Sequence, residues 1–211
     1  NVICSRRKQR AWPAPLFGSW ASASAGAALS FIESVFHSKH GDINGKVKRM
    51  NAARENTPLV ELVAEARWLP NGLPEGVAGV AGVPLMQGPD NRTDEFFMRF
   101  GAAVAGSGYS SVERLFSPVQ VLYQPVFRFK KPADANDSSL YQVGPGLFTA
   151  NALPPYESWE KFGPVVRDGV RALLASRPRG EEAKDFLSAS LRYIDAFRDD
   201  HTGGRDIHSF M

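Results

Sequence analysis

Apolar and polar residues alternate with a period of two along residues 58 to 68, PLVELVAEARW. One set of alternate positions carries Val60, Leu62, Ala64, Ala66 and Trp68. The other set carries Leu59, Glu61, Val63, Glu65 and Arg67. Because successive side chains of a strand point to opposite faces, this pattern predicts a strand with one buried and one mostly charged face, as in an antiparallel sheet.

Two segments carry apolar residues at helical spacing. In the first, residues 94 to 105, the apolar stripe is Phe96, Phe97, Phe100 and Val104. Thr93 is placed to cap this helix, and Gly106 and Gly108 follow its end. In the second, nearer the C-terminus, the stripe is Trp159, Phe162, Val166, Val170 and Leu173. Pro164 lies inside it, so either the main helix begins at Pro164 or one helix is kinked there.

Further strand-like segments are residues 111 to 119, 121 to 131, 139 to 153 and 186 to 197. The sequence therefore predicts an α+β fold, with a mainly antiparallel sheet and two helices packed on one face. The expected order is β-α-β-β-β-α-β, since a doubly wound parallel sheet would need continuously apolar strands. We expect the domain to continue past Met211, which makes it incomplete at its C-terminus.

The segment at residues 139 to 153, SLYQVGPGLFTANAL, has Gly-Pro-Gly at its centre. Proline donates no hydrogen bond to a neighbouring strand, and the two glycines weaken a strand. We therefore expect this segment to lie at an edge of the sheet, or to contain a bulge at which the chain bends between LYQV and LFTAN.

Residues 1 to 49 differ in composition from the rest of the chain. They hold eight Lys or Arg against two acidic residues, whereas the following residues hold 17 basic and 20 acidic ones. The net charge of +3 therefore comes from this segment and does not indicate a basic nucleic-acid binder. We expect a disordered or non-native leader before a single domain of residues 50 to 211, which starts at Met50. A secretory signal, or an arm that binds nucleic acid or membrane, are the alternatives.

The residue types of the domain limit its chemistry. Cys4 is the only cysteine of the chain, and the histidines after the leader are His201 and His208. Their spacing does not match H-x-x-x-H, and the sequence has neither a phosphate-loop pattern nor a G-x-S-x-G elbow. We expect no catalytic residue, metal or cofactor, and favour a cytoplasmic protein that is not an enzyme and does not span a membrane. Glu61 and Glu65 stay open as acid or base groups.

Three segments together carry a resemblance: NTPLVELVAEARW, QVGPGLFTANALPPYESWEKFGPVV and LRYIDAF. Across residues 56 to 197 the chain resembles a sporadically distributed, uncharacterised bacterial protein family. That family has a QVGPG strand leading into Y-x-x-W-x-x-F, followed by an RYIN-like strand. Asp195 stands where the family has Asn. The resemblance implies no activity and no catalytic residues, because the family has none established.

Five residues are candidates for a ligand site: Gln142, Asn151, Tyr156, Trp159 and Arg192. If the bend at Gly-Pro-Gly opens a pocket, the site would combine polar groups with aromatic rings, as ligand sites do. In the alternative interpretation, Trp159 only closes one end of the core.

Two hypotheses about function follow. The first is a non-catalytic binding or interaction protein, with a sheet face directed toward a protein partner or small ligand. That face would carry Glu61, Glu65, Arg67, Arg128, Lys130 and Arg192. The second is an enzyme or effector acting on nucleic acid in a mobile defence or toxin-antitoxin system. The acidic domain, without a basic patch interleaved with aromatic residues, favours the first.

Overall fold

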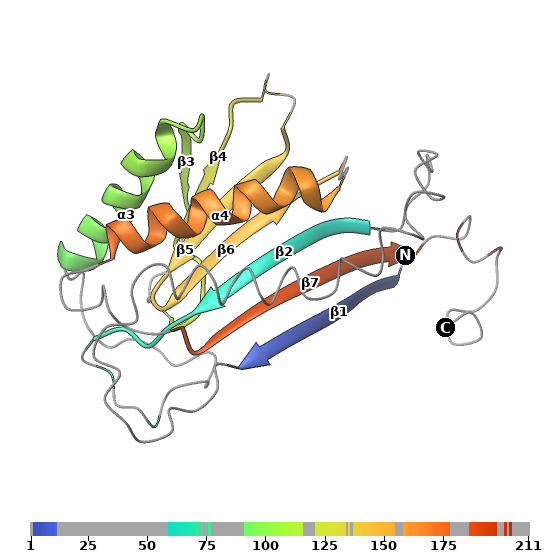
Figure 1. Cartoon of the computed structure of the whole chain (residues 1–211), viewed down its shortest axis with the longest axis horizontal. Helices are drawn as coiled ribbons and strands as arrows, with labels where there is room; N and C mark the ends of the chain where they lie inside the picture. The colour runs from blue at the N-terminus through green and yellow to red at the C-terminus, as the bar shows by residue number, and fades with distance from the viewer. Residues whose placement is uncertain are drawn as a thin grey trace.

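Seven antiparallel strands form one sheet in the order β1-β7-β2-β6-β5-β4-β3 (Figure 1). The structure is a computed structural model, which describes residues 2–11, 59–71, 73, 76, 91–115, 121–133, 135, 137–154, 158–177, 186–197, 201 and 203. The strands are β1 (Val2–Ala11), β2 (Leu59–Arg67), β3 (Ser111–Arg114), β4 (Phe127–Lys130), β5 (Ser139–Gly144), β6 (Leu147–Ala152) and β7 (Ser188–Phe197). The helices are α3 (Asn91–Ala105) and α4 (Trp159–Ser176).

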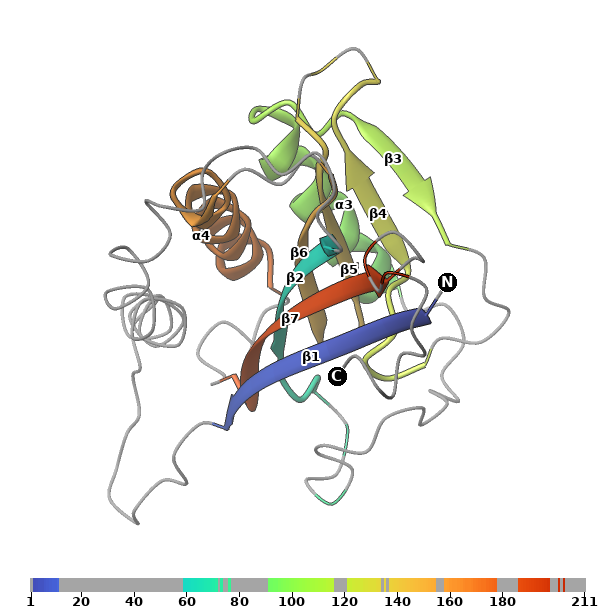
Figure 2. The ribbon, with the colours of Figure 1, turned by 90° about the vertical axis from the view of Figure 1, so that its right-hand side faces the viewer.

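Both helices pack on one face of the twisted sheet (Figures 1 and 2). Phe100 of α3 is fully buried, and its ring lies 5.3 Å from that of Phe129 and 6.0 Å from that of Phe148. Val166 and Val170 of α4 belong to the same core. The predicted α+β class, the antiparallel sheet and the placement of both helices are therefore confirmed. In the described part of the chain, no helix has the length and apolar character needed to cross a membrane.

Helix α3 begins earlier than predicted, whereas α4 is the single helix containing Pro164 that was one of the two predicted alternatives. Helix α3 begins at Asn91, so Thr93 lies inside the helix and is not its cap. Helix α4 runs without interruption from Trp159 to Ser176, with Pro164 inside it. Pro164 is exposed in the second turn of α4, where it removes one backbone hydrogen bond of the helix.

Gly-Pro-Gly forms a tight hairpin turn, so the prediction of one bent strand at residues 139 to 153 was wrong. Gly144 pairs with Leu147, and Pro145 and Gly146 are the two residues of the turn. The φ of Gly146 is +69°, which fits the third position of a type II turn after proline. The resulting strands β5 and β6 lie inside the sheet rather than at its edge. They add one strand to the predicted order.

Residues expected to belong to a separate leader form the edge strand β1. This strand is 10 residues long and pairs with β7 from Val2 opposite Phe197 to Ala11 opposite Ser188. The expected domain boundary at residue 50 therefore does not hold for β1, because its backbone continues the sheet. Without β1, the outer edge of β7 would present unpaired N–H and C=O groups. The rest of residues 1 to 49 lies outside the described part of the chain.

Candidate functional site

The face of the sheet turned away from α3 and α4 carries mostly polar residues, and we call it the polar face. Its composition follows from alternation, because Leu62, Ala64 and Ala66 of β2 point into the core and their neighbours point the other way. The polar residues that define this face are Glu61, Glu65, Arg67, Glu113, Arg128, Lys130, Gln142, Thr149, Asn151, Ser190 and Arg192.

Strand register aligns one polar residue from each of six neighbouring strands in a continuous row. Directly opposed residues in neighbouring antiparallel strands have their Cβ atoms about 4.5–5.5 Å apart, so their side chains can interact. From β3 to β7 the row is Glu113, Arg128, Gln142, Thr149, Glu65 and Ser190. The row runs from exposed charges at β3 to buried polar groups at β2 and β7.

Glu65 lies at the buried centre of the polar face. The residue is 5% exposed, and both of its carboxylate oxygens contact arginines. Arg67 Nε lies 2.9 Å from Oε1, and Arg192 Nη2 donates to Oε2 at 2.7 Å. The Arg67 guanidinium also lies 5.1 Å from the centroid of the Tyr123 ring. One buried carboxylate thus holds two guanidinium groups, whose side chains are 19% and 31% exposed.

Asn151 links a second carboxylate to the same face. Its side chain donates from Nδ2 to Glu61 Oε1 at 2.6 Å. Thr149 Oγ1 donates to Oδ1 of Asn151 at 2.7 Å. Because Thr149 and Asn151 are both buried, these bonds satisfy polar groups that would otherwise be costly to bury. The two linked hydrogen bonds therefore fix the side chains of Thr149, Asn151 and Glu61 on one side of the polar face.

The β3 and β4 side of the polar face carries exposed ion pairs. Glu113 contacts Lys130 Nζ at 2.8 Å and Arg128 Nη1 at 3.3 Å. The hydrogen bond and the charge of Lys130 lower the pKa of the Glu113 carboxyl below its ordinary value. With the Gln142 amide rotated by 180°, its oxygen accepts from Arg128 Nε and Nη2 at 3.1 and 3.2 Å. Gln142 therefore belongs to this outer group, and in the strand register it stands opposite Thr149.

The structure separates the five candidate residues predicted from the sequence. Gln142, Asn151 and Arg192 lie on the polar face. Trp159 belongs to α4 on the other side of the sheet, where its half-buried ring lies 5.9 Å from that of Phe162. Tyr156 lies outside the described residues. Whether Gln142, Asn151 and Arg192 bind a ligand stays a prediction.

Sequence reasoning placed Glu65, Arg67 and Arg192 on one binding face, but it did not show that Glu65 holds both arginines. Alternation placed Glu65 and Arg67 on one face, but it did not reveal which strands flank β2. Ser190 and Thr149 gave no signal of their own, because single hydroxyl residues occur on most strands. The pairing of β2 with β6 on one side and β7 on the other is what assembles the group.

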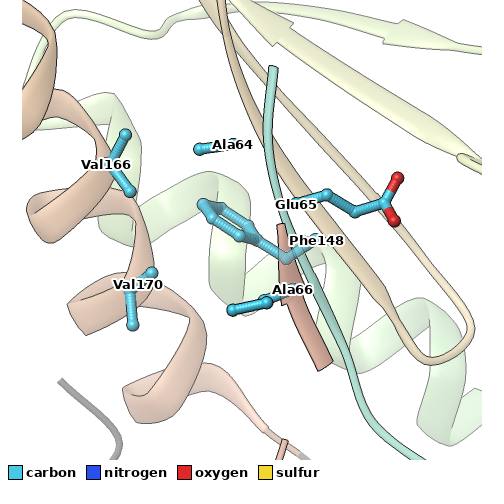
Figure 3. A pocket seen from close by; sticks show the side chains of 7 residues that line it. Ala64, Glu65, Ala66, Phe148, Val166 and Val170 are labelled. Atoms are coloured by element: carbon cyan, nitrogen blue, oxygen red, sulfur yellow. The ribbon is translucent and has the colours of Figure 1, made fainter. Parts of the chain in front are cut away.

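An apolar pocket lies on the opposite side of β2, beneath α4 (Figure 3). Its lining includes Ala64, Ala66, Phe148, Val166 and Val170. Glu65 is also at its wall, but Figure 3 shows the carboxylate pointing away from α4. Small alanine side chains facing a helix leave such a gap in the packing. The pocket offers no polar side chain to orient a ligand, so we place no site there.

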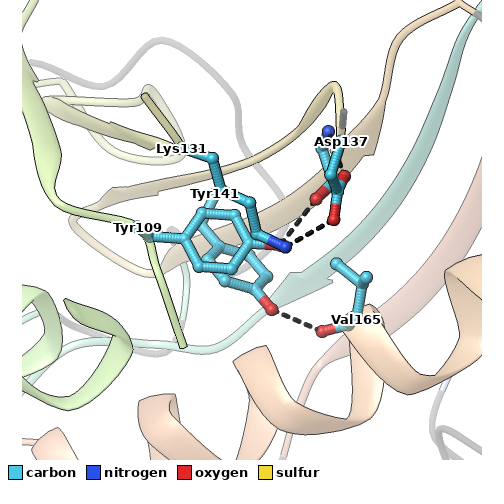
Figure 4. Close-up of polar contacts among 6 residues, drawn as sticks. Tyr109, Lys131, Asp137, Tyr141 and Val165 are labelled. Atoms are coloured by element: carbon cyan, nitrogen blue, oxygen red, sulfur yellow. Dashed lines mark hydrogen bonds and ion pairs between the residues drawn. The ribbon is translucent and has the colours of Figure 1, made fainter. Parts of the chain in front are cut away.

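A second polar group joins the end of α3 to α4 (Figure 4). Tyr141 Oη donates to the carbonyl oxygen of Val165 at 2.7 Å, and the Tyr109 ring lies 4.3 Å from the Tyr141 ring. Lys131 lies 4.9 Å from the Tyr109 ring and forms an ion pair with Asp137. Burial, with a smaller effect of Tyr109, raises the pKa of the Tyr141 hydroxyl well above 10.0. This hydroxyl therefore stays protonated and acts as a structural donor.

Replacing Tyr141 by phenylalanine should cost about 1 kcal/mol of unfolding free energy at neutral pH, because one buried hydrogen bond is lost. The raised pKa gives stability that is complete below about pH 10 and is lost as the pH rises further. The difference between wild type and Tyr141→Phe should therefore shrink at about pH 11. Urea unfolding at both pH values measures it, and an unchanged difference would contradict a buried neutral hydroxyl.

The described residues contain no group of three or more His, Cys, Asp and Glu side chains placed to hold a metal ion. His201, the only described histidine, lies against the ring of Phe197 at 6.3 Å. His208 lies outside the described part of the chain. The described residues of the polar face present charged hydrogen-bond donors and acceptors held in ion pairs.

No protein family, no curated protein and no solved structure matches this chain. The resemblance carried by the QVGPG and RYID segments therefore stays a prediction. Support for a function comes from the geometry of the polar face.

Proposed function

We propose that this protein is a non-catalytic binding protein and that the polar face is its binding surface. The observation that carries the proposal is the arrangement of Arg67 and Arg192 around the buried Glu65. Their guanidinium groups are partly exposed, while the carboxylate that holds them is not. A surface that fixes charged side chains in this way loses less conformational entropy when it binds a ligand.

The connected hydrogen bonds of the polar face support the same function. Glu61 is held through Asn151, and Arg128 through Glu113 and Gln142. Such side chains keep defined positions, whereas isolated surface charges sample many rotamers. Polar groups in fixed positions are what a specific ligand site requires.

The charges of the polar face favour a small ligand or a protein partner over nucleic acid. Arg128 and Lys130 share Glu113 as their counterion, so they do not form an unpaired basic stripe. The ring of Tyr123, which lies against Arg67, is only 6% exposed and so offers little surface on which bases could stack. We therefore propose that the protein does not act on nucleic acid. We also propose that it is located in the cytoplasm and that it belongs to the family it resembles.

Thermal melts of the full chain with a panel of charged small molecules test this proposal. The panel contains inorganic phosphate, succinate, arginine, glutamate, AMP and a single-stranded oligonucleotide. A compound present at 100 times its Kd stabilises the fold by about 2.7 kcal/mol, which should raise Tm by roughly 5–10 °C. We expect at least one small molecule to do so.

Two arginine variants locate the bound compound. Arg192→Gln should abolish the rise in Tm, because it removes a polar-face guanidinium. Arg171→Gln is the matched control, since Arg171 is an exposed arginine of α4 paired with Asp168. A rise in Tm that survives Arg192→Gln would place the binding surface elsewhere. A panel in which only the oligonucleotide stabilises the chain would favour the nucleic-acid function.

A further inference from the structure

We infer that the polar face contains a subsite for an oxyanion, a carboxylate or phosphate group, formed by Arg67, Arg192 and Ser190. This inference rests on the proposed function and names the chemical class of the group that anchors the ligand. The subsite lies where β2 and β7 run side by side, around the carboxylate of Glu65.

The hydroxyl of Ser190 is buried without a hydrogen-bond partner among the described residues. Ser190 is 1% exposed and stands directly opposite Glu65 in the pairing of β2 with β7. Its neighbours Ala189 and Leu191 belong to the core, so alternation directs Ser190 to the polar face. Buried hydroxyl groups almost always have a partner, which makes this one a candidate for contact with a ligand.

Both arginines have an Nε–H group that Glu65 does not satisfy. Arg192 bonds Glu65 through Nη2, and its Nε is buried without a hydrogen-bond partner in the described part of the structure. Arg67 Nε lies 2.9 Å from Glu65 Oε1 as an ion pair, but it is not aligned for a hydrogen bond. Together with Ser190, these groups are three donors around one carboxylate.

The ligand group that accepts these hydrogen bonds should carry a negative charge, and a cationic group should not bind here. Each oxygen of Glu65 already contacts one arginine, so Glu65 does not present a free acceptor for a cationic ligand. Glu61, the other carboxylate nearby, accepts from Asn151. The unsatisfied groups of Arg67, Arg192 and Ser190 are all donors, so the ligand group must supply acceptor oxygens. Carboxylates and phosphates offer several oxygen acceptors and match the planar donor pattern of a guanidinium group.

Glu65 would act in this subsite as a positioning residue. It contacts Arg67 through Nε and Arg192 through Nη2, so each guanidinium group keeps further N–H groups for a ligand. The Tyr123 ring, 5.1 Å from the Arg67 guanidinium, restricts Arg67 further. Arginines held in place lose little conformational freedom when the oxyanion binds.

Titrations of the full chain with inorganic phosphate and, separately, with succinate test the subsite. Amide NMR shifts give the apparent Kd, with potassium chloride at matched ionic strength as the reference. Phosphate and succinate distinguish a phosphate-bearing from a carboxylate-bearing ligand. We expect at least one of them to shift the amides of Ser190 and Arg192, and chloride to leave them unchanged.

Ser190→Ala is the decisive variant, and Ser176→Ala is its control. Ser176 is a buried serine of α4 whose hydroxyl donates to the Ala172 carbonyl. We expect Ser190→Ala to weaken anion binding about tenfold, because a hydrogen bond to a charged group is lost. The same variant should melt no lower than wild type without anion, since it removes an unsatisfied hydroxyl. Ser176→Ala should leave the Kd unchanged.

The results separate this inference from the proposed function. If neither anion shifts Ser190 and Arg192, or if Ser190→Ala binds as tightly as Ser176→Ala, the oxyanion subsite is wrong. The polar face would still be the binding surface if another panel compound depends on Arg192. If no compound depends on Arg192, the proposed function itself fails.

Discussion

Replacing Gly144 by alanine is expected to cost about 3 kcal/mol or more of unfolding free energy. A Cβ atom at this position would lie 1.8 Å from the carbonyl oxygen of Gln124 and 3.1 Å from Cα of Pro125. These are backbone atoms, so no side chain can rotate away to relieve the overlap. The segment at residues 124 and 125 or the hairpin would have to move, and overpacking of this kind is strongly destabilising.

Gly106→Ala is the matched control for Gly144→Ala. Gly106 follows α3, and a Cβ atom there would meet nothing within 4 Å. Its substitution should change stability by less than about 0.5 kcal/mol, because it is a surface change without a clash. Urea unfolding monitored by tryptophan fluorescence measures both variants. Equal stability of the two variants would mean that the backbone of Gln124 and Pro125 does not lie against Gly144 as described.

Glu65→Gln should have the second large effect, a loss of about 3 kcal/mol. The amide has nearly the same shape as the carboxylate but removes the charge that Arg67 and Arg192 share. Removing one partner of a buried ion pair typically costs about 3–5 kcal/mol. We expect the lower end of that range, because both arginines reach solvent and can be partly hydrated there.

Glu113→Gln provides the comparison for Glu65→Gln. Glu113 also contacts two basic side chains, Arg128 and Lys130, but its side chain is 47% exposed. Exposed ion pairs are screened by water and contribute little to stability, so this variant should unfold close to wild type. Similar losses in both variants would show that the environment of Glu65 is not buried as described.

The sequence predicted an element and its buried face correctly where the residues of one segment alone determine them. Alternation in residues 58 to 68 predicted both faces of β2, and the phenylalanine stripe predicted α3 on the core side. Gly-Pro-Gly was ambiguous, because proline and glycine suit a bend in one strand as well as a turn between two. Only the register of Gly144 with Leu147 distinguishes these possibilities.

The candidate site depends on contacts between distant segments, which local patterns do not contain. Arg192 and Glu65 are separated by 127 positions, and Asn151 and Glu61 by 90. Each contact exists because β2 lies between β6 and β7. Strand β1 was missed for another reason, since its basic sequence lacks the apolar alternation of a half-buried strand. It joins the sheet by pairing its backbone with β7.

Amide NMR mapping of the full chain, with the panel compound that raises Tm most, tests the central claim most directly. If the polar face is the binding surface, the largest shifts should include Glu65, Thr149 and Ser190, which are neighbours across β6, β2 and β7. Residues of α4 that contact the apolar pocket, Val166 and Val170, should change little. The largest shifts in α3 and α4, with the three polar-face residues unchanged, would contradict the account.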